Sequence, residues 1–162
     1  MKIKIIITGG TFDKEYNELS GRLFFKKTHI HEMLKLGRSK VQTVIKSLMM
    51  IDSLYMTNKD RLKILDECKK SKEKNIVITH GTDTMQETAK ILGGKIKNKT
   101  IVITGAMVPY KFGSSDGLFN LGSAISFAQV LPHGVYVAMN GKYFCWTNVR
   151  KNRKKGEFET KS

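Results

Sequence analysis

The sequence of 162 residues has only 2 cysteines and no long apolar run. Cys68 and Cys145 stand far apart without paired spacing, which excludes a disulfide framework and a zinc signature and favours a reducing compartment. The apolar run that follows Lys4 is too short for a signal peptide, and no stretch is long enough to span a membrane. We therefore expect a cytoplasmic protein of one domain, because a hydrophobic content of 40% suffices for a single core.

Acidic residues are also few: 14 Asp and Glu stand against 29 Lys and Arg, which gives a net charge of +15. Such a charge is common among proteins that bind nucleic acids or anionic membranes. However, only 5 of the cations are arginines, and no series of stacking aromatic residues accompanies the scattered lysines. We interpret the charge as a solvated lysine-rich surface and expect neither partner. A phosphate-binding loop is missing as well, which argues against nucleotide hydrolysis.

Three apolar runs are present, and each ends in a small polar cluster. They read Ile-Ile-Ile-Thr-Gly-Gly-Thr at residues 5–11, Ile-Val-Ile-Thr-His-Gly-Thr-Asp-Thr at 76–84 and Ile-Val-Ile-Thr-Gly-Ala-Met at 101–107. If the runs are neighbouring parallel strands, their carboxyl ends place these loops at one edge, where open α/β sheets bind ligands. The pattern indicates an enzyme built around hydroxyl nucleophiles.

The remaining chain alternates short β-branched runs with helical patterns, which is typical of βαβ units. We predict an α/β fold with a doubly wound, mainly parallel sheet in a single domain, 1–162, with a core of about 3–149 and a basic segment at 150–162. Helices are expected at 28–36 and at 116–131. A third helix is expected to begin at Thr57, which forms a capping box with Asp60. A fourth is expected to begin at Thr84, with Glu87 as its capping partner, and to end at Gly93 and Gly94. A second strand is expected at 41–50. Residues 12–22 have neither period and are expected to form a loop, often a functional lid. Asn140-Gly141 predicts a hairpin turn.

The chemistry of the threonine clusters is open at this point. Thr11 follows two glycines, but a threonine hydroxyl needs activation, either by Tyr16 or by a lysine held beside Asp83. A strand-to-loop turn at Thr11 and a helix cap at Thr82 explain the same residues equally well.

Histidines and the basic run give weaker signals. His80 follows a strand and is a candidate either for a general base or for a supporting hydrogen bond, the second fitting better. His29 and His31 diverge in a short helix, so we interpret them as surface residues rather than metal ligands. The basic run 150–155 is typical of a solvated or nucleic-acid-touching face.

Taken in order, the motifs resemble those of the bacterial-type L-asparaginase family. The matching segments are Thr-Gly-Gly-Thr at 8–11, His-Gly-Thr-Asp-Thr at 80–84, Thr-Gly-Ala-Met at 104–107, Ser-Ser-Asp-Gly at 114–117 and Asn-Val-Arg-Lys-Asn at 148–152. The match runs from about residue 3 to 159 and is similar to short-chain members that correspond to the family's N-terminal domain.

The resemblance implies a role for each matching residue. Thr11 is the implied primary nucleophile, with Tyr16 beside it on a mobile loop. A second catalytic group consists of Thr82, Asp83 and Lys151, so that one charge of the basic run is buried. The implied reaction proceeds through an acyl-enzyme intermediate and needs no metal and no cofactor.

The resemblance also implies how the substrate is held. Backbone N–H groups of Thr82 and Ala106 receive the oxyanion, while Ser53 and Asp83 hold the α-carboxylate and α-amino groups. Tyr55 and Val108 depart from the family's usual residues, which suggests a shifted substrate preference.

We therefore expect an L-asparaginase that hydrolyses L-asparagine and forms a homo-oligomer, a dimer or a tetramer. Two alternatives stay open. One is a related amide hydrolase acting on glutamine or on glutaminyl-tRNA, and the other is a catalytically silent, basic RNA-binding or interaction module.

Overall fold

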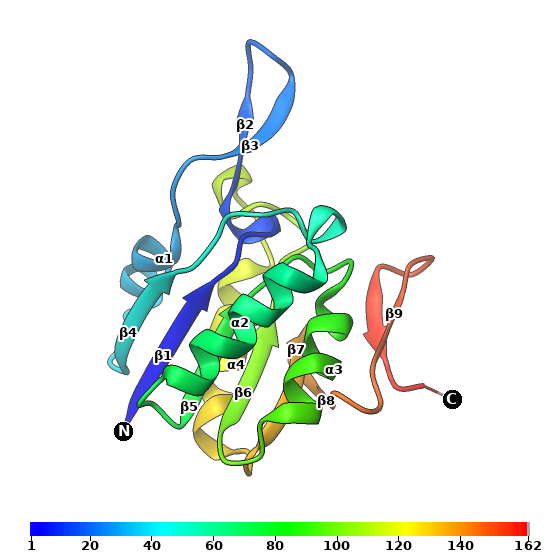
Figure 1. Ribbon diagram of the computed structural model, residues 1–162. Helices are drawn as coiled ribbons and strands as arrows, with labels where there is room; N and C mark the ends of the chain where they lie inside the picture. The colour runs from blue at the N-terminus through cyan, green and yellow to red at the C-terminus, as the bar shows by residue number, and fades with distance from the viewer. Residues whose placement is uncertain (162) are drawn as a thin grey trace.

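The fold is known from a computed structural model that describes residues 1–161. Its centre is a sheet with the strand order β4-β1-β5-β6-β7-β8. The strands are β1 (Lys2–Ile7), β4 (Gln42–Ser47), β5 (Asn75–Thr79), β6 (Thr100–Thr104), β7 (Gly134–Met139) and β8 (Lys142–Cys145). All neighbours are parallel except β8, which returns antiparallel to β7 (Figure 1). The three apolar runs form adjacent strands, so the predicted arrangement is confirmed.

Helices cover both faces of this sheet, as Figure 1 shows. Helices α2 (Asn58–Lys70) and α3 (Met85–Lys95) lie on one face, and α1 (Ile30–Leu36) and α4 (Gly117–Val130) lie on the other. Strand residues alternate between the two cores: Ile76 and Ile78 pack with α2 and α3, whereas Val77 packs with α1 and α4. This period of two, buried on both faces, explains why each strand is a continuous apolar run. The doubly wound α/β fold is confirmed.

Residues 12–22 differ from the expected loop. Thr11–Asp13 form a 3-10 turn, and β2 (Lys14–Asn17) pairs antiparallel with β3 (Arg22–Phe25). The turn between the two strands is closed by Asn17, whose side-chain oxygen accepts hydrogen bonds from the backbone N–H groups of Leu19 and Ser20. The resulting hairpin projects from the body of the domain (Figure 1). The sequence pattern missed it because cross-strand pairing, rather than alternation of apolar residues, defines it.

A second hairpin lies beside α3 and forms a separate small sheet. Its strands are β9 (Arg150–Asn152) and β10 (Glu157–Glu159), and its central pair is Lys151 opposite Phe158. Phe158 is buried in the core on the α2 and α3 face. Anchoring Phe158 therefore fixes the position of Lys151.

Helix ends were predicted with mixed success. The capping box of Thr57 and Asp60 at the start of α2 is present and confirmed. The box predicted at Thr84 is wrong, because the Thr84 hydroxyl donates instead to the Ser53 carbonyl. Helix α3 also continues through Gly93 and Gly94 to Lys95. At Gly93 a Cβ would come within 2.4 Å of the Trp146 ring, so this glycine serves helix packing rather than termination.

Cys68 belongs to the core on the α2 and α3 face. Cys68 is fully buried, and burial raises the pKa of its thiol to about 12. Within residues 1–161, no helix is both long and apolar enough to cross a membrane.

Candidate active site

The loops that follow β1, β5 and β6 meet at the carboxyl edge of the sheet. Gly10, before Thr11, lies so close to the β5 loop that a Cβ there would come 2.4 Å from the backbone nitrogen of Gly81. A Cβ on Gly105, after β6, would come 2.6 Å from the His80 carbonyl oxygen and 3.0 Å from Cγ2 of Thr82. Because these glycines have no side chain, the backbones of the three loops can approach one another closely. Both threonine clusters and the Gly105-Ala106 loop therefore lie together.

Lys151 joins this edge from the β9–β10 hairpin. Its Nζ donates hydrogen bonds to Oγ1 of Thr82 at 2.8 Å and to Oδ1 of Asp83 at 2.9 Å. The side chain is only 8% exposed, whereas that of Asp83 is 31% exposed. An amine, a hydroxyl and a carboxylate in direct contact can store and pass a proton. A helix cap does not explain Thr82 and Asp83, because α3 starts with Thr84 at its N-cap and has no side-chain cap there.

Arg153 is a further charge at this cluster, and the sequence analysis missed it. Its Nη1 lies 3.6 Å from the same Oδ1 of Asp83, although its side chain is 66% exposed. The side-chain oxygen of Asn152 accepts from the backbone N–H groups of Lys154 and Lys155 and so holds the turn that positions Arg153. Arg153 lies in the turn directly after β9, and no sequence pattern signalled its contact with Asp83.

Thr11 begins the 3-10 turn that follows β1, and it is half-buried. The turn is anchored by Asp13, whose fully buried carboxylate accepts hydrogen bonds from the backbone N–H of His29 and the Thr28 hydroxyl. Burial raises the pKa of the Asp13 carboxyl. The backbone that presents Thr11 is therefore fixed to the start of α1.

The interpretation of His29 as a surface residue is wrong. Its side chain is 1% exposed and lies against the Tyr110 ring, with centroids 5.9 Å apart. Nε2 of His29 lies 3.2 Å from the Glu15 carboxylate at the base of the β2–β3 hairpin. His31 is exposed, so the two histidines do diverge as the helical spacing implied.

Ser53 lies in a 3-10 turn, Ser53–Tyr55, beside Gly81. It is 1% exposed, and its hydroxyl has no hydrogen-bond partner within residues 1–161. The Thr84 hydroxyl donates to the Ser53 carbonyl and accepts from the buried Arg61, which fixes the turn. Buried hydroxyls in folded proteins usually have a partner, so an unpartnered one next to the β5 loop needs an explanation.

The loop that contains Ala106 is held by Asp116 and Asn120 of α4. The Asp116 carboxylate accepts from the backbone N–H groups of Met107 and Val108. The fully buried Asn120 donates from Nδ2 to the carbonyl of Gly105 at 2.9 Å. Asn120 was missed, although its spacing of four from Asp116 places both residues on one side of a helix.

His80 is completely buried between two hydrogen bonds. Its Nδ1 lies 2.8 Å from the carbonyl oxygen of Gly81 and its Nε2 lies 2.8 Å from the Thr88 hydroxyl. Burial lowers the pKa of His80 to about 4. Because its accepting nitrogen is occupied by Thr88, this histidine supports the loop rather than accepting a proton from a substrate.

Tyr16 lies apart from this cluster. It belongs to β2 of the projecting hairpin, is 57% exposed and stands edge-on to Phe112 with ring centroids 6.4 Å apart. The Lys14–Asp52 ion pair joins the base of this hairpin to the turn of Ser53. The structure thus assembles the other predicted residues at one edge and leaves Tyr16 on an arm attached to it.

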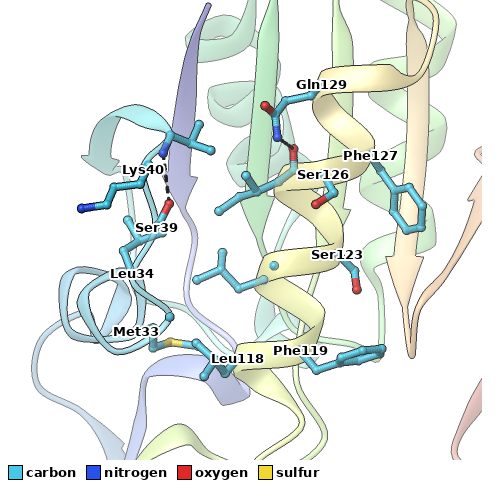
Figure 2. Close-up of a pocket in the computed structure, with 15 residues that line it drawn as sticks. Met33, Leu34, Ser39, Lys40, Leu118, Phe119, Ser123, Ser126, Phe127 and Gln129 are labelled. Atoms are coloured by element: carbon cyan, nitrogen blue, oxygen red, sulfur yellow. Dashed lines mark hydrogen bonds between the residues drawn. The ribbon is translucent and has the colours of Figure 1, made fainter.

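An apolar groove of about 600 Å³ lies elsewhere, between α1 and α4 (Figure 2). Its lining includes Leu34, Leu118, Phe119 and Phe127. In the described chain no predicted site residue lines this groove, so it is separate from the cluster at the sheet edge.

The fold and the cluster together define an α/β domain with a hydroxyl, an amine and a carboxylate in contact at the carboxyl edge of its sheet. The sequence model of the family described as Asparaginase, N-terminal, matches residues 2–158, and the chain belongs to this family. The predicted resemblance is confirmed.

Individual relatives agree with this assignment. The L-asparaginase of Thermococcus kodakarensis is 31% identical over 158 residues, which are 93% of this chain and 48% of that protein. Its structure aligns with a TM-score of 0.87 at 29% identity, over 99% of this chain and 51% of the other. A structure titled probable cytoplasmic L-asparaginase from Campylobacter jejuni aligns with a TM-score of 0.81 at 30% identity, over 94% and 50%.

Another relative has a name that indicates a different activity. It is a glutamyl-tRNA(Gln) amidotransferase component from Methanococcus vannielii, which is 30% identical over 149 residues, or 86% of this chain and 34% of that protein. The chain spans about half the length of the L-asparaginases that it matches.

Proposed function

We propose that the protein hydrolyses the side-chain amide of L-asparagine to give L-aspartate and ammonia. The observation that carries this proposal is the contact of the nearly buried Lys151 with Thr82 and Asp83, at the edge where the turn of Thr11 lies. A solvated basic run does not explain why one of its lysines is enclosed in this way.

In the proposed reaction the Thr11 oxygen bonds to the amide carbon of the substrate, and the carbonyl electron pair moves to its oxygen. The hydroxyl proton passes through Thr82 to the amine of Lys151, and the Asp83 carboxylate stabilises the resulting ammonium. Collapse of the intermediate breaks the C–N bond, and the nitrogen leaves with this proton as ammonia. Water then hydrolyses the acyl-threonine ester and restores Thr11. The mechanism calls for no metal ion or cofactor.

The developing oxyanion accepts hydrogen bonds from the backbone N–H groups of Thr82 and Ala106. Donors of this type are worth about 3 kcal/mol each in enzymes where one has been removed. The buried Ser53 hydroxyl binds the α-carboxylate of the substrate, and Asp83 binds the α-amino group. The unpartnered state of the Ser53 hydroxyl supports this role.

Tyr16 takes part through a movement of the β2–β3 hairpin toward the edge of the sheet. The hairpin stands out from the domain and bears other exposed apolar residues, among them Leu19 and Leu23. Closure would cover those side chains and exclude water from the site. It would also bring the Tyr16 hydroxyl to the turn of Thr11, where it activates the nucleophile.

Ammonia release from asparagine, glutamine and a substrate-free control tests the proposal. We expect release from asparagine to exceed that from glutamine, because the relatives from Thermococcus kodakarensis and Campylobacter jejuni are named L-asparaginases. Faster release from glutamine would transfer the proposal to a glutaminase, and no release from either would reject it for free amino acids.

A second candidate function is hydrolysis of a glutaminyl group attached to tRNA. Two observations favour it: the similarity to the amidotransferase component of Methanococcus vannielii and the net charge of +15. Ammonia released from glutaminyl-tRNA but not from free glutamine or asparagine would support this candidate. RNA binding that weakens with salt, without any ammonia, would instead indicate a silent basic module.

We also propose that the protein acts in the cytoplasm and that its copies form a homo-oligomer, a dimer or a tetramer. The relative from Campylobacter jejuni, titled cytoplasmic, supports the first point. Helix α4, which contains no charged residue, supports the second.

A further inference from the structure

The two backbone N–H groups at the site belong to peptide units whose carbonyls are each bound by a buried side chain. The carbonyl of Gly81 accepts from the His80 ring at 2.8 Å. The carbonyl of Gly105 accepts from Nδ2 of Asn120 at 2.9 Å. His80 and Asn120 are both 0% exposed.

A trans peptide is planar, and its C=O and N–H bonds point in opposite directions. Binding the Gly81 carbonyl to His80 therefore turns the N–H of Thr82 away from the ring. Binding the Gly105 carbonyl to Asn120 likewise turns the N–H of Ala106 away from α4. Within residues 1–161 neither N–H donates to a backbone carbonyl across these loops. Neither N–H is therefore used by the backbone pairing of these loops.

The side chains that bind these carbonyls are themselves held in place. Asn120 also donates to Asp116, and its Oδ1 accepts from the backbone N–H of Asn140 at 2.9 Å. A carbonyl can only accept, so the proton of neutral His80 resides on Nδ1, and Nε2 accepts from the Thr88 hydroxyl at 2.8 Å. Every polar atom of the His80 ring and of the Asn120 side chain has a partner, which leaves neither side chain free to rotate.

We propose that Asn120 and His80 are positioning residues that orient the oxyanion-binding N–H groups of Ala106 and Thr82 through their peptide planes. The inference rests on the proposed amide hydrolysis for its effect on rate, but the peptide orientation itself is a property of the fold. Neither residue touches the substrate, and His80 transfers no proton. Because pre-set donors act on the transition state more than on the ground state, their loss lowers kcat and spares KM.

The test for Asn120 compares Asn120→Ala with Asn75→Ala. Asn75 also donates from its side-chain amide to a carbonyl, that of Ala128, but at the start of β5, the opposite end of the sheet. We expect Asn120→Ala to lower kcat for asparagine by ten- to a hundredfold with KM changed less than threefold, and Asn75→Ala to lower thermal stability alone. Equal kcat values for the two variants would overturn the role of Asn120.

The test for His80 uses a rescue and does not depend on Asn120→Ala folding. Asparagine places its Nδ2 where histidine has Nδ1, so His80→Asn keeps the donor to Gly81, whereas His80→Leu removes it. The variant Thr88→Val removes only the partner of Nε2. We expect kcat to stay within threefold of wild type in His80→Asn and Thr88→Val and to fall at least tenfold in His80→Leu. A kcat that follows thermal stability across all three variants contradicts the proposal.

Backbone amide resonances separate this inference from the proposed function. The 15N and 1H shifts of Ala106 should change in Asn120→Ala and those of Thr82 in His80→Leu, while the controls leave them in place. These shifts are measured without any substrate. If the wild type releases no ammonia from either amino acid, the proposed function fails while the orientation is still decided. If both resonances stay unchanged in the variants, the orientation is rejected whatever the activity.

Discussion

At the scale of single residues, Lys151 is the most informative, because its environment separates it from the other cations of the same run. It is 8% exposed and bound to Thr82 and Asp83, whereas Lys154 is exposed in the following turn. The positive charge of the run therefore divides into one enclosed amine and several solvated ones.

Replacing the enclosed amine should abolish turnover. We expect Lys151→Met to lower kcat for asparagine by at least a hundredfold, because Thr82 and Asp83 lose the group that accepts and returns the proton. Lys154→Met removes the same charge from the same hairpin and should change kcat less than twofold. Steady-state ammonia release measures both, and equal small effects would return the whole run to a solvated surface.

A second prediction at this scale concerns His80 and pH. The pKa of His80 is lowered from 6.5 to about 4 in the folded protein, so the unfolded chain binds more protons between these values. The free energy of unfolding should fall as the pH drops from about 6.5 to 4, by about 3 kcal/mol in total at 1.36 kcal/mol per pKa unit.

The reference for this prediction is His80→Asn, which lacks the ionisable ring. Asp13, whose pKa is raised, acts in the opposite direction but is present in both proteins, so it cancels in the comparison. Urea unfolding at several pH values gives the difference. A constant gap between the two proteins from pH 4 to 7 would show that burial does not suppress protonation of this ring.

Residue patterns predicted part of this site and missed the rest for physical reasons. The strand ends placed Thr11, Thr82 and Ala106 together because parallel strands share a carboxyl edge. Lys151 joins from 68 residues beyond Asp83, and only the family resemblance identified it. Arg153 and Asn120 act through folded contacts, with Asp83 and with the Gly105 carbonyl, that no local motif announces.

At the scale of elements, helix ends divide into those that are local and those that depend on tertiary contacts. The box at Thr57 needs only Asp60, three residues away, and the sequence predicted it. At Thr84 the hydroxyl has partners from other elements, Ser53 and Arg61, which override the cap. The β2–β3 hairpin was also missed and expected as a loop, because cross-strand pairing rather than a pattern of apolar residues defines it.

The local cap gives a prediction about stability that spares activity. Thr57→Ala removes the hydroxyl that accepts from the Asp60 backbone N–H, and such losses cost about 1 kcal/mol. We expect the urea midpoint to fall accordingly while kcat for asparagine stays unchanged, because the exposed Thr57 side chain bonds to Asp60 and not to a residue of the cluster. Thr57→Ser, which keeps the hydroxyl, should restore the midpoint, and an equal loss in both variants would exclude the cap as its cause.

At the scale of the whole molecule, charge restricts where a second copy can bind. A chain of net charge +15 repels its own copies wherever lysines face one another. Helix α4 has no charged residue over its whole length, and its Phe119 and Val130 are 62% and 76% exposed. The groove of Figure 2 lies beside this face. We expect the proposed homo-oligomer to form through it, with the same face used by both copies.

The assembly is tested by light scattering at several protein concentrations. Phe119→Lys places a charge on the exposed side of the first turn of α4 and should shift the protein to monomers. Leu62→Lys adds the same charge at a half-exposed position on α2, at the opposite face of the sheet, and should leave the assembly intact. A monomeric wild type, or dissociation by both variants alike, would contradict the assignment of this face.

The central claim is that Thr11, supported by Thr82, Asp83 and Lys151, attacks the amide of asparagine. The most direct measurement is ammonia release from L-asparagine by the wild type and by Thr11→Ala, with circular dichroism to verify that the variant is folded. The account predicts release by the wild type and a loss of at least a hundredfold in the folded variant. Near-normal release by Thr11→Ala, or no release by the wild type, would contradict it.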